Sequence, residues 1–404
     1  MKPIIFIFGS NPQISLAELD AIIGSGALKL IFRECAIAEL PDDADISALQ
    51  KRLGGTVKIG QVIGRVNPHT KDFGAGVKEN ELAGALKNFL GKENKNIFGI
   101  SAYLAGGAVN IKAIQEKMKR IGLGLKKEFK AAGRRSRFVV SREDKLSSAA
   151  VVKNKLLTEG VEFLVLAGAN EFILGKTLIV QDFEKYNLRD YGRPAPAPRS
   201  GMLPPKLAQM MINISKIRKN QTLLDPFCGS GTILQEAANL GIANIIGTDN
   251  EVYAVSNSQK NLAWFQEKFK IKPRSLRIFQ CDARKLAEKI AANSIDAIIA
   301  EPYLGPPLTG REPLSIIQKN RDELEALYAA AFQEFAKILK PGGVIVFIFP
   351  RFLKGDQVFE IRNLDQIKKS GFTIESLSEN RRCSIIYQKD IQHLAREIFV
   401  FKRN

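Results

Sequence analysis

The chain is poor in the residues that build metal centres and disulfide scaffolds. Its 404 residues include two histidines, His69 and His393, and four cysteines without a Cys-x-x-Cys pair. We therefore expect neither histidine-based metal or triad chemistry, nor a zinc site, nor a disulfide framework. The cysteines are expected to be reduced, buried thiols, and the functional site is expected to hold no metal.

Long apolar runs are absent as well. The longest, such as Val344–Phe349, fall far short of the roughly 20 residues that span a bilayer. The apolar start Ile4–Phe8 turns polar at Ser10, so it indicates a first strand and not a secretory signal. With 45% hydrophobic and 25% charged residues, the composition is typical of a globular protein of two or three domains, expected in the cytoplasm and without a membrane partner.

Acidic residues are too few to balance the basic ones, since 42 Asp and Glu against 60 Lys and Arg give a net charge of +18. The excess is concentrated: residues 101–150 carry 12 basic and 4 acidic side chains, whereas residues 1–50 carry 3 and 7. Such a segment attracts polyphosphate through counterion release, which favours nucleic-acid binding over a merely well-solvated helix face. The candidate RNA-binding side chains are Lys126, Lys127, Arg134, Arg135 and Arg137.

A proline-rich stretch, residues 191–201, divides the chain and is expected to be a semi-extended connector. Before it, strands and helices alternate as small α+β units, with one strand over Leu28–Leu40 and a softer break around Gly54–Lys78. After it, short strands separated by helices predict a doubly wound parallel sheet. Two closely spaced last strands, over Ser384–Gln388 and Glu397–Lys402, predict an antiparallel hairpin at one edge.

The sharpest local pattern follows the apolar strand Thr222–Asp225 and continues Pro-Phe-Cys-Gly-Ser-Gly-Thr up to residue 232. Glycines at a helix start let backbone amides approach a ligand closely. The Lys of a P-loop is absent, and Leu234 replaces the third glycine of a dinucleotide fingerprint. The pattern favours S-adenosylmethionine over NAD, with Asp225 near its ammonium group. The candidate cofactor-binding residues of this turn are Asp225, Phe227, Gly229, Gly231 and Thr232.

Acids also end the next two strands. Asp249, followed by Asn250, stands where a carboxylate takes ribose hydroxyls in this fold. Asp282, followed by Ala283, could accept the amino group of adenine. One such acid is usually a solvated turn residue, but three at successive carboxyl ends of parallel strands point to one crevice. We therefore add these four residues to the candidate cofactor site.

A fourth strand ends in Ala300-Glu301-Pro302-Tyr303. Together with the glycine-rich turn, this loop resembles the amino-group methyltransferases that carry an Asp/Asn-Pro-Pro-Tyr motif. The stretches Arg189–Pro194 and Met202–Ala208 resemble the THUMP-containing tRNA guanosine-N2 methyltransferases of archaea and eukaryotes. The resemblance covers roughly residues 95–350, is specific in the catalytic half, and is looser before it.

The resemblance implies an α/β chain with a Rossmann-like methyltransferase domain over residues 205–404. It also implies a ferredoxin-like region over 1–90, a THUMP-like region over 91–182 that grips the tRNA acceptor end, and a linker over 183–204. The implied reaction moves a methyl group from S-adenosylmethionine to the N2 amine of a guanosine in tRNA. Glu301, Pro302 and Tyr303 form the implied catalytic loop, with Tyr303 stacking on a base taken out of its stack.

The loop departs from the family pattern at the residue that should accept the amine N–H bonds. Aligned on Pro302 and Tyr303, the Asp/Asn position is Ala300, whose side chain accepts nothing. Glu301 could supply the acceptor oxygen, a backbone carbonyl could, or activity could be lost; we favour Glu301. An adenine-N6 methyltransferase on rRNA or DNA and an RNA-binding protein with an inactive methyltransferase fold remain alternatives. The target nucleotide, the oligomeric state and any partner subunit are not predicted.

Overall fold

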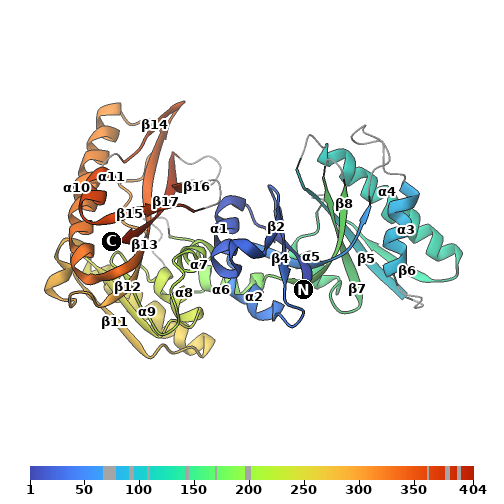
Figure 1. Cartoon of the computed structure of the whole chain (residues 1–404), viewed down its shortest axis with the longest axis horizontal. Helices are drawn as coiled ribbons and strands as arrows, with labels where there is room; N and C mark the ends of the chain where they lie inside the picture. Colours follow the sequence, from blue (N-terminus) through green and yellow to red (C-terminus); the bar gives the residue numbers. More distant parts are fainter. Residues whose placement is uncertain are drawn as a thin grey trace. The chain divides into compact units, whose positions relative to one another are not determined.

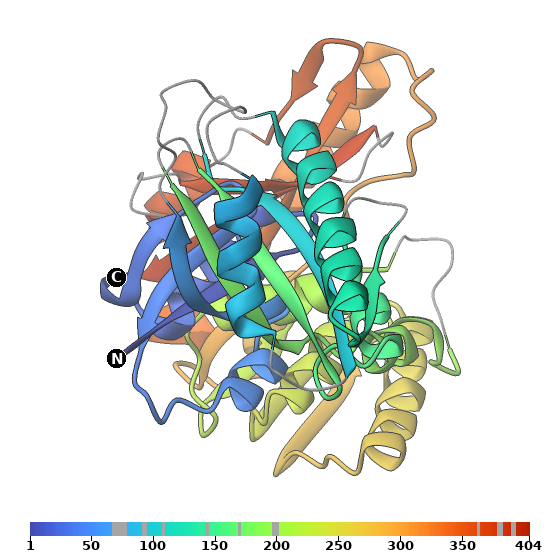
Figure 2. The same cartoon turned by 90° about the vertical axis from the view of Figure 1, so that its right-hand side faces the viewer.

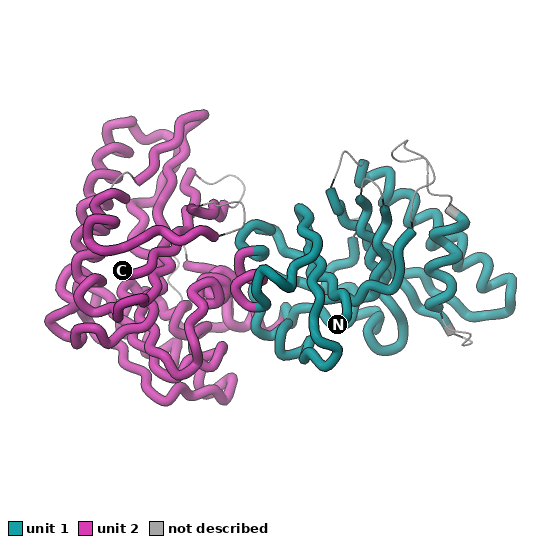
Figure 3. The backbone as a smooth tube through the Cα atoms, in the orientation of Figure 1, with its two compact units in different colours: residues 1–16, 23–183 teal, residues 17–22, 184–404 magenta. Residues whose placement is uncertain are grey.

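The computed structural model describes residues 1–66, 79–90, 95–106, 110–141, 145–168, 171–195, 202–361, 364–377, 383–388 and 393–404. They divide into two compact units (Figure 3). Residues 1–16 and 23–183 make the first unit, and residues 17–22 and 184–404 make the second. Among the described residues, we find no helix whose length and hydropathy would allow it to cross a bilayer.

The first unit is built on one mixed sheet of eight strands, in the order β2-β3-β1-β4-β8-β7-β5-β6 (Figure 1). Strand β5 pairs in parallel with β6 and β7, and the other recorded pairs are antiparallel. The strand bounds are β1 Lys2–Phe8, β2 Leu28–Ile31, β3 Cys35–Leu40, β4 Thr56–Val66, β5 Lys95–Leu104, β6 Arg135–Val139, β7 Gly160–Ala167 and β8 Phe172–Val180.

Two helices, α3 (Glu79–Phe89) and α4 (Ile111–Ala131), lie across one face of this sheet (Figure 2). The buried apolar residues of α4 recur every three or four positions, so the helix turns one stripe to the sheet and, Lys117 apart, leaves its basic side chains outside. Gly122 permits the close approach, because a Cβ there would stand 2.2 Å from the Phe138 ring. The other helices are α1 Pro12–Ile23, α2 Ile46–Arg52 and α5 Ser148–Lys153.

Two expectations for the first unit were wrong. Leu28–Leu40 is not one strand but the hairpin β2–β3, closed by a bond from the Phe32 amide to the Cys35 carbonyl at 2.9 Å. The break expected around Gly54–Lys78 holds the central strand β4, while residues 67–78 lie outside the described part. The glycines misled because Gly60 serves contact, not a turn: a Cβ there would stand 2.6 Å from Leu164 Cδ1 and 2.8 Å from a backbone oxygen.

A buried ion pair lies in this sheet. Lys58 Nζ on β4 is 2.5 Å from Glu162 Oε1 on β7, and their side chains are 2% and 0% exposed. Ser101 and Thr177 donate hydroxyl bonds to the same carboxylate, at 2.7 and 2.6 Å. Lys58 also donates to the Leu146 carbonyl. Burial lowers the pKa of Lys58, and Glu162 opposes that shift. The pair is therefore stable only as a complete network.

The second unit has a nine-stranded sheet whose main path runs β11-β10-β9-β12-β13-β17-β15. Strands β9 to β13 are parallel neighbours along this path, with helices between them, so the expected doubly wound α/β sheet is confirmed. The strand bounds are β9 Thr222–Asp225, β10 Asn244–Asp249, β11 Ser275–Gln280, β12 Ile295–Ala300, β13 Leu339–Lys354, β14 Gln357–Phe359, β15 Phe372–Glu375, β16 Ser384–Tyr387 and β17 Leu394–Arg403.

The helices of this unit include the long α10, which packs on the sheet through an aromatic cluster. Phe332 on α10 lies 5.2 Å from Phe347 and 5.1 Å from Phe401, measured between ring centroids. The residues that contact Phe332 are buried in the same core, so this packing stabilises the unit far more than a surface helix contact would. The helix bounds are α6 Phe183–Tyr191, α7 Pro205–Ile214, α8 Thr232–Asn239, α9 Val252–Phe269, α10 Leu314–Ile338 and α11 Leu364–Lys369.

The two last strands pair antiparallel as expected, but β17 is not an edge strand. One side of β17 pairs with β13, and the other pairs with β16 and with β15. The short strand β15 was not predicted from the sequence. The predicted hairpin was therefore placed at the edge of the sheet, whereas β17 has neighbours on both sides. Arg396, the third residue of β17, has pairing partners on both sides, Pro350 of β13 and Tyr387 of β16.

The linker expected over residues 183–204 differs in its first part. Residues 183–191 form helix α6, with Tyr186 and Arg189 buried. Tyr186 Oη donates to Gln209 Oε1 at 2.6 Å, which attaches α6 to α7. Residues 196–201, with two of the alternating prolines, lie outside the described part of the chain. The prolines correctly marked an interruption of helix, but it begins after α6 and not before it.

We predict that Lys58→Met destabilises the first unit by about 3–5 kcal/mol, because the charge of Glu162 stays buried without its partner. Urea unfolding followed by circular dichroism measures the loss. The matched control is Lys155→Met, which breaks a pair whose side chains are 63% and 41% exposed. That change should cost about 0–1 kcal/mol. Equal losses for the two variants would contradict a structural role for the buried pair.

Candidate active site

The carboxyl ends of three neighbouring strands are tied together by backbone hydrogen bonds. Cys228 N, after β9, donates to Thr248 O on β10 at 2.8 Å. Cys281 N, after β11, donates to Asp249 O at 3.0 Å. The turns that carry the candidate residues therefore lie at one edge of the sheet. Strand β12 flanks β9 on the other side, so the chain reverses its order of addition between β9 and β12, the usual place for a ligand crevice.

The glycine-rich turn has the left-handed backbone that glycine permits. Gly229 has φ 51° and Gly231 has φ 84°. At Gly231 a Cβ would stand 2.6 Å from Ser258 Oγ and 2.8 Å from Leu262 Cδ2, so the turn packs directly on α9. At Gly229 a Cβ would meet nothing closer than 4.0 Å. Helix α8 begins at Thr232, immediately after the turn. One glycine thus serves packing, and the other leaves open space at the helix start.

Asp249 determines the shape of this turn. Its Oδ2 accepts the Gly229 amide at 2.9 Å, and its Oδ1 accepts the Glu251 amide at 3.0 Å. Burial raises the pKa of Asp249, while these amide bonds oppose the shift. The adjacent Asn250 is exposed, and its carbonyl accepts a bond from Gln280 at 2.9 Å. The sequence placed Asp249 at a ribose; the structure adds that it also connects two turns.

Asp225 is 1% exposed, and its Oδ1 accepts the Phe227 amide at 3.1 Å. Burial raises the pKa of this carboxyl well above its usual range, and the charges of Asp249 and Glu301 raise it further. A buried acid with one recorded amide partner suits a cationic ligand group, which would return its pKa toward normal. The Phe227 ring lies edge-on to Phe347, with centroids 6.3 Å apart.

Asp282 is engaged differently from the other two acids. It caps a short 3-10 helix, Ala283–Glu288, and accepts the Arg284 amide at 2.9 Å. The Arg284 guanidinium reaches both of its oxygens, with Nη2 to Oδ2 at 2.6 Å. This hydrogen bonding lowers the pKa of Asp282. Ala283 is buried beside it. An adenine amine at Asp282 would have to share these oxygens with Arg284, so that assignment stays a prediction.

In the catalytic loop, Ala300 and Glu301 have opposite environments. Ala300 is the last residue of β12 and is fully buried in the hydrophobic core. Glu301 follows it and accepts a bond from Arg396 Nε at 2.5 Å. Pro302 is buried, whereas Tyr303 is 60% exposed, with its carbonyl held by Tyr328 Oη at 2.6 Å. Ala300 therefore cannot face a substrate. The choice of Glu301 as the acceptor stays a prediction, beside a backbone carbonyl and loss of activity.

Residues 189–195 support the glycine-rich turn from behind, which sequence reasoning missed. Arg189 pairs with Glu236 on α8 at 2.6 Å, and both side chains are at most 5% exposed. The Arg193 guanidinium donates to Thr232 Oγ1 at 2.6 Å. The side-chain amide of Asn261 on α9 accepts a bond from the Ala195 backbone amide and donates to the Ala195 carbonyl. It also donates to the Ser230 carbonyl. The sequence marked Arg189–Pro194 only as a stretch that resembles the family, and nothing in it indicated which residues the arginines contact.

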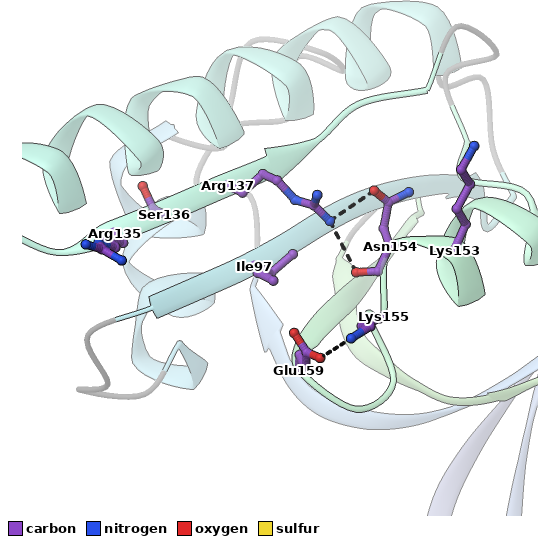
Figure 4. A pocket seen from close by; sticks show the side chains of 8 residues that line it. All are labelled: Ile97, Arg135, Ser136, Arg137, Lys153, Asn154, Lys155 and Glu159. Atoms are coloured by element: carbon purple, nitrogen blue, oxygen red, sulfur yellow. Dashed lines mark hydrogen bonds and ion pairs between the residues drawn. The ribbon is translucent and has the colours of Figure 1, made fainter.

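A second, basic site lies in the first unit, at one end of β5 and β6. A cavity of about 470 Å³ is lined by Ile97, Arg135, Ser136, Arg137, Lys153, Asn154, Lys155 and Glu159 (Figure 4). The Arg137 guanidinium is held by Asn154 Oδ1 at 3.0 Å, while Lys155 pairs with Glu159. Lys126, Lys127 and Arg135 are exposed, and Arg134 lies over the Phe129 ring at 4.5 Å. The predicted RNA-binding residues thus separate into a helix surface and a cavity.

Comparison with known proteins identifies the second unit. Residues 193–378 match the model of the family described as RMKL-like, methyltransferase domain. This part of the chain is similar to a methyltransferase domain. It is similar to tRNA guanine-N2-methyltransferases, as expected from the stretches Arg189–Pro194 and Met202–Ala208.

Several curated relatives share this domain. The tRNA (guanine(10)-N2)-dimethyltransferase of Methanocaldococcus jannaschii is 27% identical over 199 residues, which are 47% of this chain and 50% of the relative. That of Methanothermobacter thermautotrophicus is 30% identical over 48% of this chain and 52% of the relative. A tRNA (guanine(6)-N2)-methyltransferase of Thermus thermophilus is 35% identical over 28% and 32%. The chain spans about half the length of the first curated relatives it matches.

Solved structures extend the likeness in fold to the whole chain. TrmN from Thermus thermophilus has a TM-score of 0.60 at 18% identity and covers 100% of both chains. SMU.472, solved as a complex with SAH, has a TM-score of 0.51 at 13% identity over 100% of this chain and 99% of that one. These identities are low, so the two structures support the architecture of both units and not their ligands.

We predict that Gly231→Ala destabilises the methyltransferase domain more than Gly229→Ala does. Both changes place a Cβ on a left-handed backbone, at about 1–2 kcal/mol. At Gly231 the clash with Ser258 and Leu262 adds about 1–3 kcal/mol of overpacking. Denaturant unfolding of the two variants measures the difference. Equal losses, or a larger loss for Gly229→Ala, would contradict the packing role given to Gly231.

Proposed function

We propose that the protein transfers a methyl group from S-adenosylmethionine to the N2 amine of a guanosine in tRNA, in the cytoplasm. The observation that carries the proposal is the meeting of Asp225, Asp249 and Glu301 at one edge of the sheet. It occurs in a domain related to tRNA guanine-N2-methyltransferases. The residue pattern at this edge suits a cationic, ribose-bearing ligand and an amine acceptor in adjacent positions.

The residues around the glycine-rich turn fit this cofactor. Asp225 is a buried acid that would face the ammonium of the methionine moiety, and Asp249 would accept ribose hydroxyls. The open space at Gly229 leaves room for a ligand at the start of α8. When bound, S-adenosylmethionine supplies an electrophilic methyl group. The protein then has to place the acceptor amine in line with it and remove one proton.

The acceptor amine would be positioned and deprotonated by the loop Glu301-Pro302-Tyr303. The N2 lone pair is conjugated into the guanine ring, so the amine is a poor nucleophile. A carboxylate that accepts its N–H bond makes the lone pair more available and stabilises the positive charge that develops on nitrogen. Glu301 would take the proton that nitrogen loses as it gains the methyl group. The exposed ring of Tyr303 can stack on the flipped base, and the buried Pro302 stiffens the loop between them.

The first unit would bind the RNA. We infer that residues 1–90 and 91–182 are the ferredoxin-like and THUMP-like regions of the family. The exposed lysines of α4 and the basic cavity would contact phosphates without reading sequence. A cavity that holds an ordered Arg137 beside Ser136 and Asn154 offers donors of the kind that bind phosphate oxygens. In this division the second unit would catalyse methyl transfer and the first unit would bind the RNA.

The proposal predicts N2-methylguanosine in unmodified tRNA transcripts after incubation with the protein and S-adenosylmethionine, detected by mass spectrometry of nucleosides. Asp249→Ala should lose activity and bind the cofactor about tenfold or more weakly in calorimetry, because charged hydrogen bonds are lost. Glu251→Ala, two residues on and exposed, is the matched control and should behave like the unchanged protein. N6-methyladenosine as the product would redirect the assignment to adenine. Absence of any methylated nucleoside would overturn it.

The RNA-binding role predicts a change in salt dependence. Replacing Lys126, Lys127, Arg134 and Arg135 with alanine should flatten the slope of log affinity against log salt by about 0.7–0.9 for each lost phosphate contact. Filter binding of tRNA over a salt series measures this. The control variant replaces four basic residues of the second unit with alanine: Lys268, Lys270, Lys272 and Arg274. It removes the same net charge and should leave the slope unchanged. Equal slopes for the two variants would exclude the basic segment.

A further inference from the structure

We propose that Arg396 is the positioning residue of the methyl-transfer site, aiming and charging the Glu301 carboxylate. The inference rests on the proposed function, because it assigns a purpose to a pair in the same loop. Arg396 lies about a hundred residues after Glu301 in the sequence, and its Nε reaches Glu301 Oε1 at 2.5 Å. Both side chains are largely shielded from water, at 10% and 14% exposure. In such a site a charge-assisted hydrogen bond is both short and strong.

The identity of residue 301 explains why a second residue is needed. A glutamate has one more methylene and one more rotatable bond than the Asp or Asn of the family motif, so its carboxylate samples more positions. Ala300 offers no alternative acceptor, since its side chain lies in the core. The bond from Arg396 fixes one carboxylate oxygen, Oε1, and a carboxylate retains acceptor capacity on Oε2 for an incoming N–H bond. Glu301 can therefore be held and still be used.

Arg396 is itself rigidly placed. It is the third residue of β17 (Leu394–Arg403), opposite Pro350 of β13 on one side and Tyr387 of β16 on the other. Because the backbone of Arg396 is paired on both sides, its bond to Glu301 ties the loop after β12 to the sheet. This arrangement makes the carboxylate geometry a property of the sheet and not of the loop alone.

The charged and titratable groups around Glu301 come from four elements. Burial raises the pKa of Glu301, and Arg396 of β17 opposes that shift without cancelling it. Asp225 of β9, Tyr328 of α10 and Tyr387 of β16 also interact electrostatically with the Glu301 charge. Arg396 is the cation among these groups. Its removal would leave a shielded carboxyl near a buried acid, and the pKa of Glu301 would rise further.

The consequence for pH has a definite sign. The ionised carboxylate is the active form, because it accepts N–H bonds and finally the proton. With the pKa of Glu301 raised, that form is lost at a higher pH, so the acid limb of the activity profile moves up. The direction distinguishes a positioning role from general damage, since a loosely folded variant would lose activity without moving the limb.

The test compares kcat against pH on unmodified tRNA transcripts for Arg396→Gln, Arg396→Lys and Arg351→Gln. Arg396→Gln should move the acid limb up by at least one pH unit, with cofactor affinity in calorimetry within twofold of the unchanged protein. Arg396→Lys keeps the positive charge, so its acid limb should lie close to that of the unchanged protein. Arg351 makes a carboxylate pair with Glu360 on the same sheet, at 2.7 Å, and its variant should show no movement. Superimposable profiles for Arg396→Gln and the unchanged protein would overturn the inference.

A second measurement does not depend on activity. In Arg396→Gln the folded pKa of Glu301 lies above its unfolded value, so stability should fall as pH rises through that interval. Adding Glu301→Gln should remove this fall, and the double variant should lose less stability than the sum of the two single ones. If the unchanged protein methylates no tRNA, the proposed function fails while this coupling can still be seen. Additive losses at every pH would refute the pair itself.

Discussion

The hydrogen bond between the Gly229 amide and the Asp249 carboxylate is the contact on which the methyltransferase site depends. It connects the turn after β9 to the end of β10, and the backbone bonds at Cys228 and Cys281 extend the connection to β11. A carboxylate that already accepts amide bonds is oriented before a ligand arrives, so little ordering is left for binding. The burial of Asp225 has the same effect from the neighbouring turn. The candidate site is therefore preorganised by contacts among the residues that follow the strand ends.

Helix and connector packing keep this edge in place. Gly231 lets the turn touch α9, and Asn261 of that helix bonds both the Ser230 carbonyl and Ala195. The Arg189–Glu236 pair is shielded from water, so it is specific in geometry even where its net contribution to stability is small. Residues that precede the methyltransferase sheet in sequence are therefore part of its construction. This accounts for a family match that begins at residue 193, before the first strand.

The sequence was sufficient where chemistry and periodicity agree. Strand-end acids, a glycine-rich turn and alternating strands and helices predicted the doubly wound sheet and the edge where Asp225 and Asp249 meet. The failures have a common physical cause: residues of one type serve opposite purposes. Gly60 makes room for neighbouring side chains instead of turning the chain. Arg189 and Arg396, to which the sequence alone assigned no contact, are partners shielded from water. Partners so distant in sequence can be found only once the fold has joined them.

The place of Arg396 has a consequence for biosynthesis. Strand β17 follows every other described strand of its sheet in the sequence, yet it lies between β13 on one side and β15 and β16 on the other. A ribosome-bound chain that has folded through β13 would contain the glycine-rich turn and Glu301 but not Arg396. The catalytic carboxylate would then acquire its partner only when the last strand inserts, a slow non-local step. The candidate cofactor-binding elements would in this sense be synthesised first, and the proposed methyl-transfer loop would be assembled last.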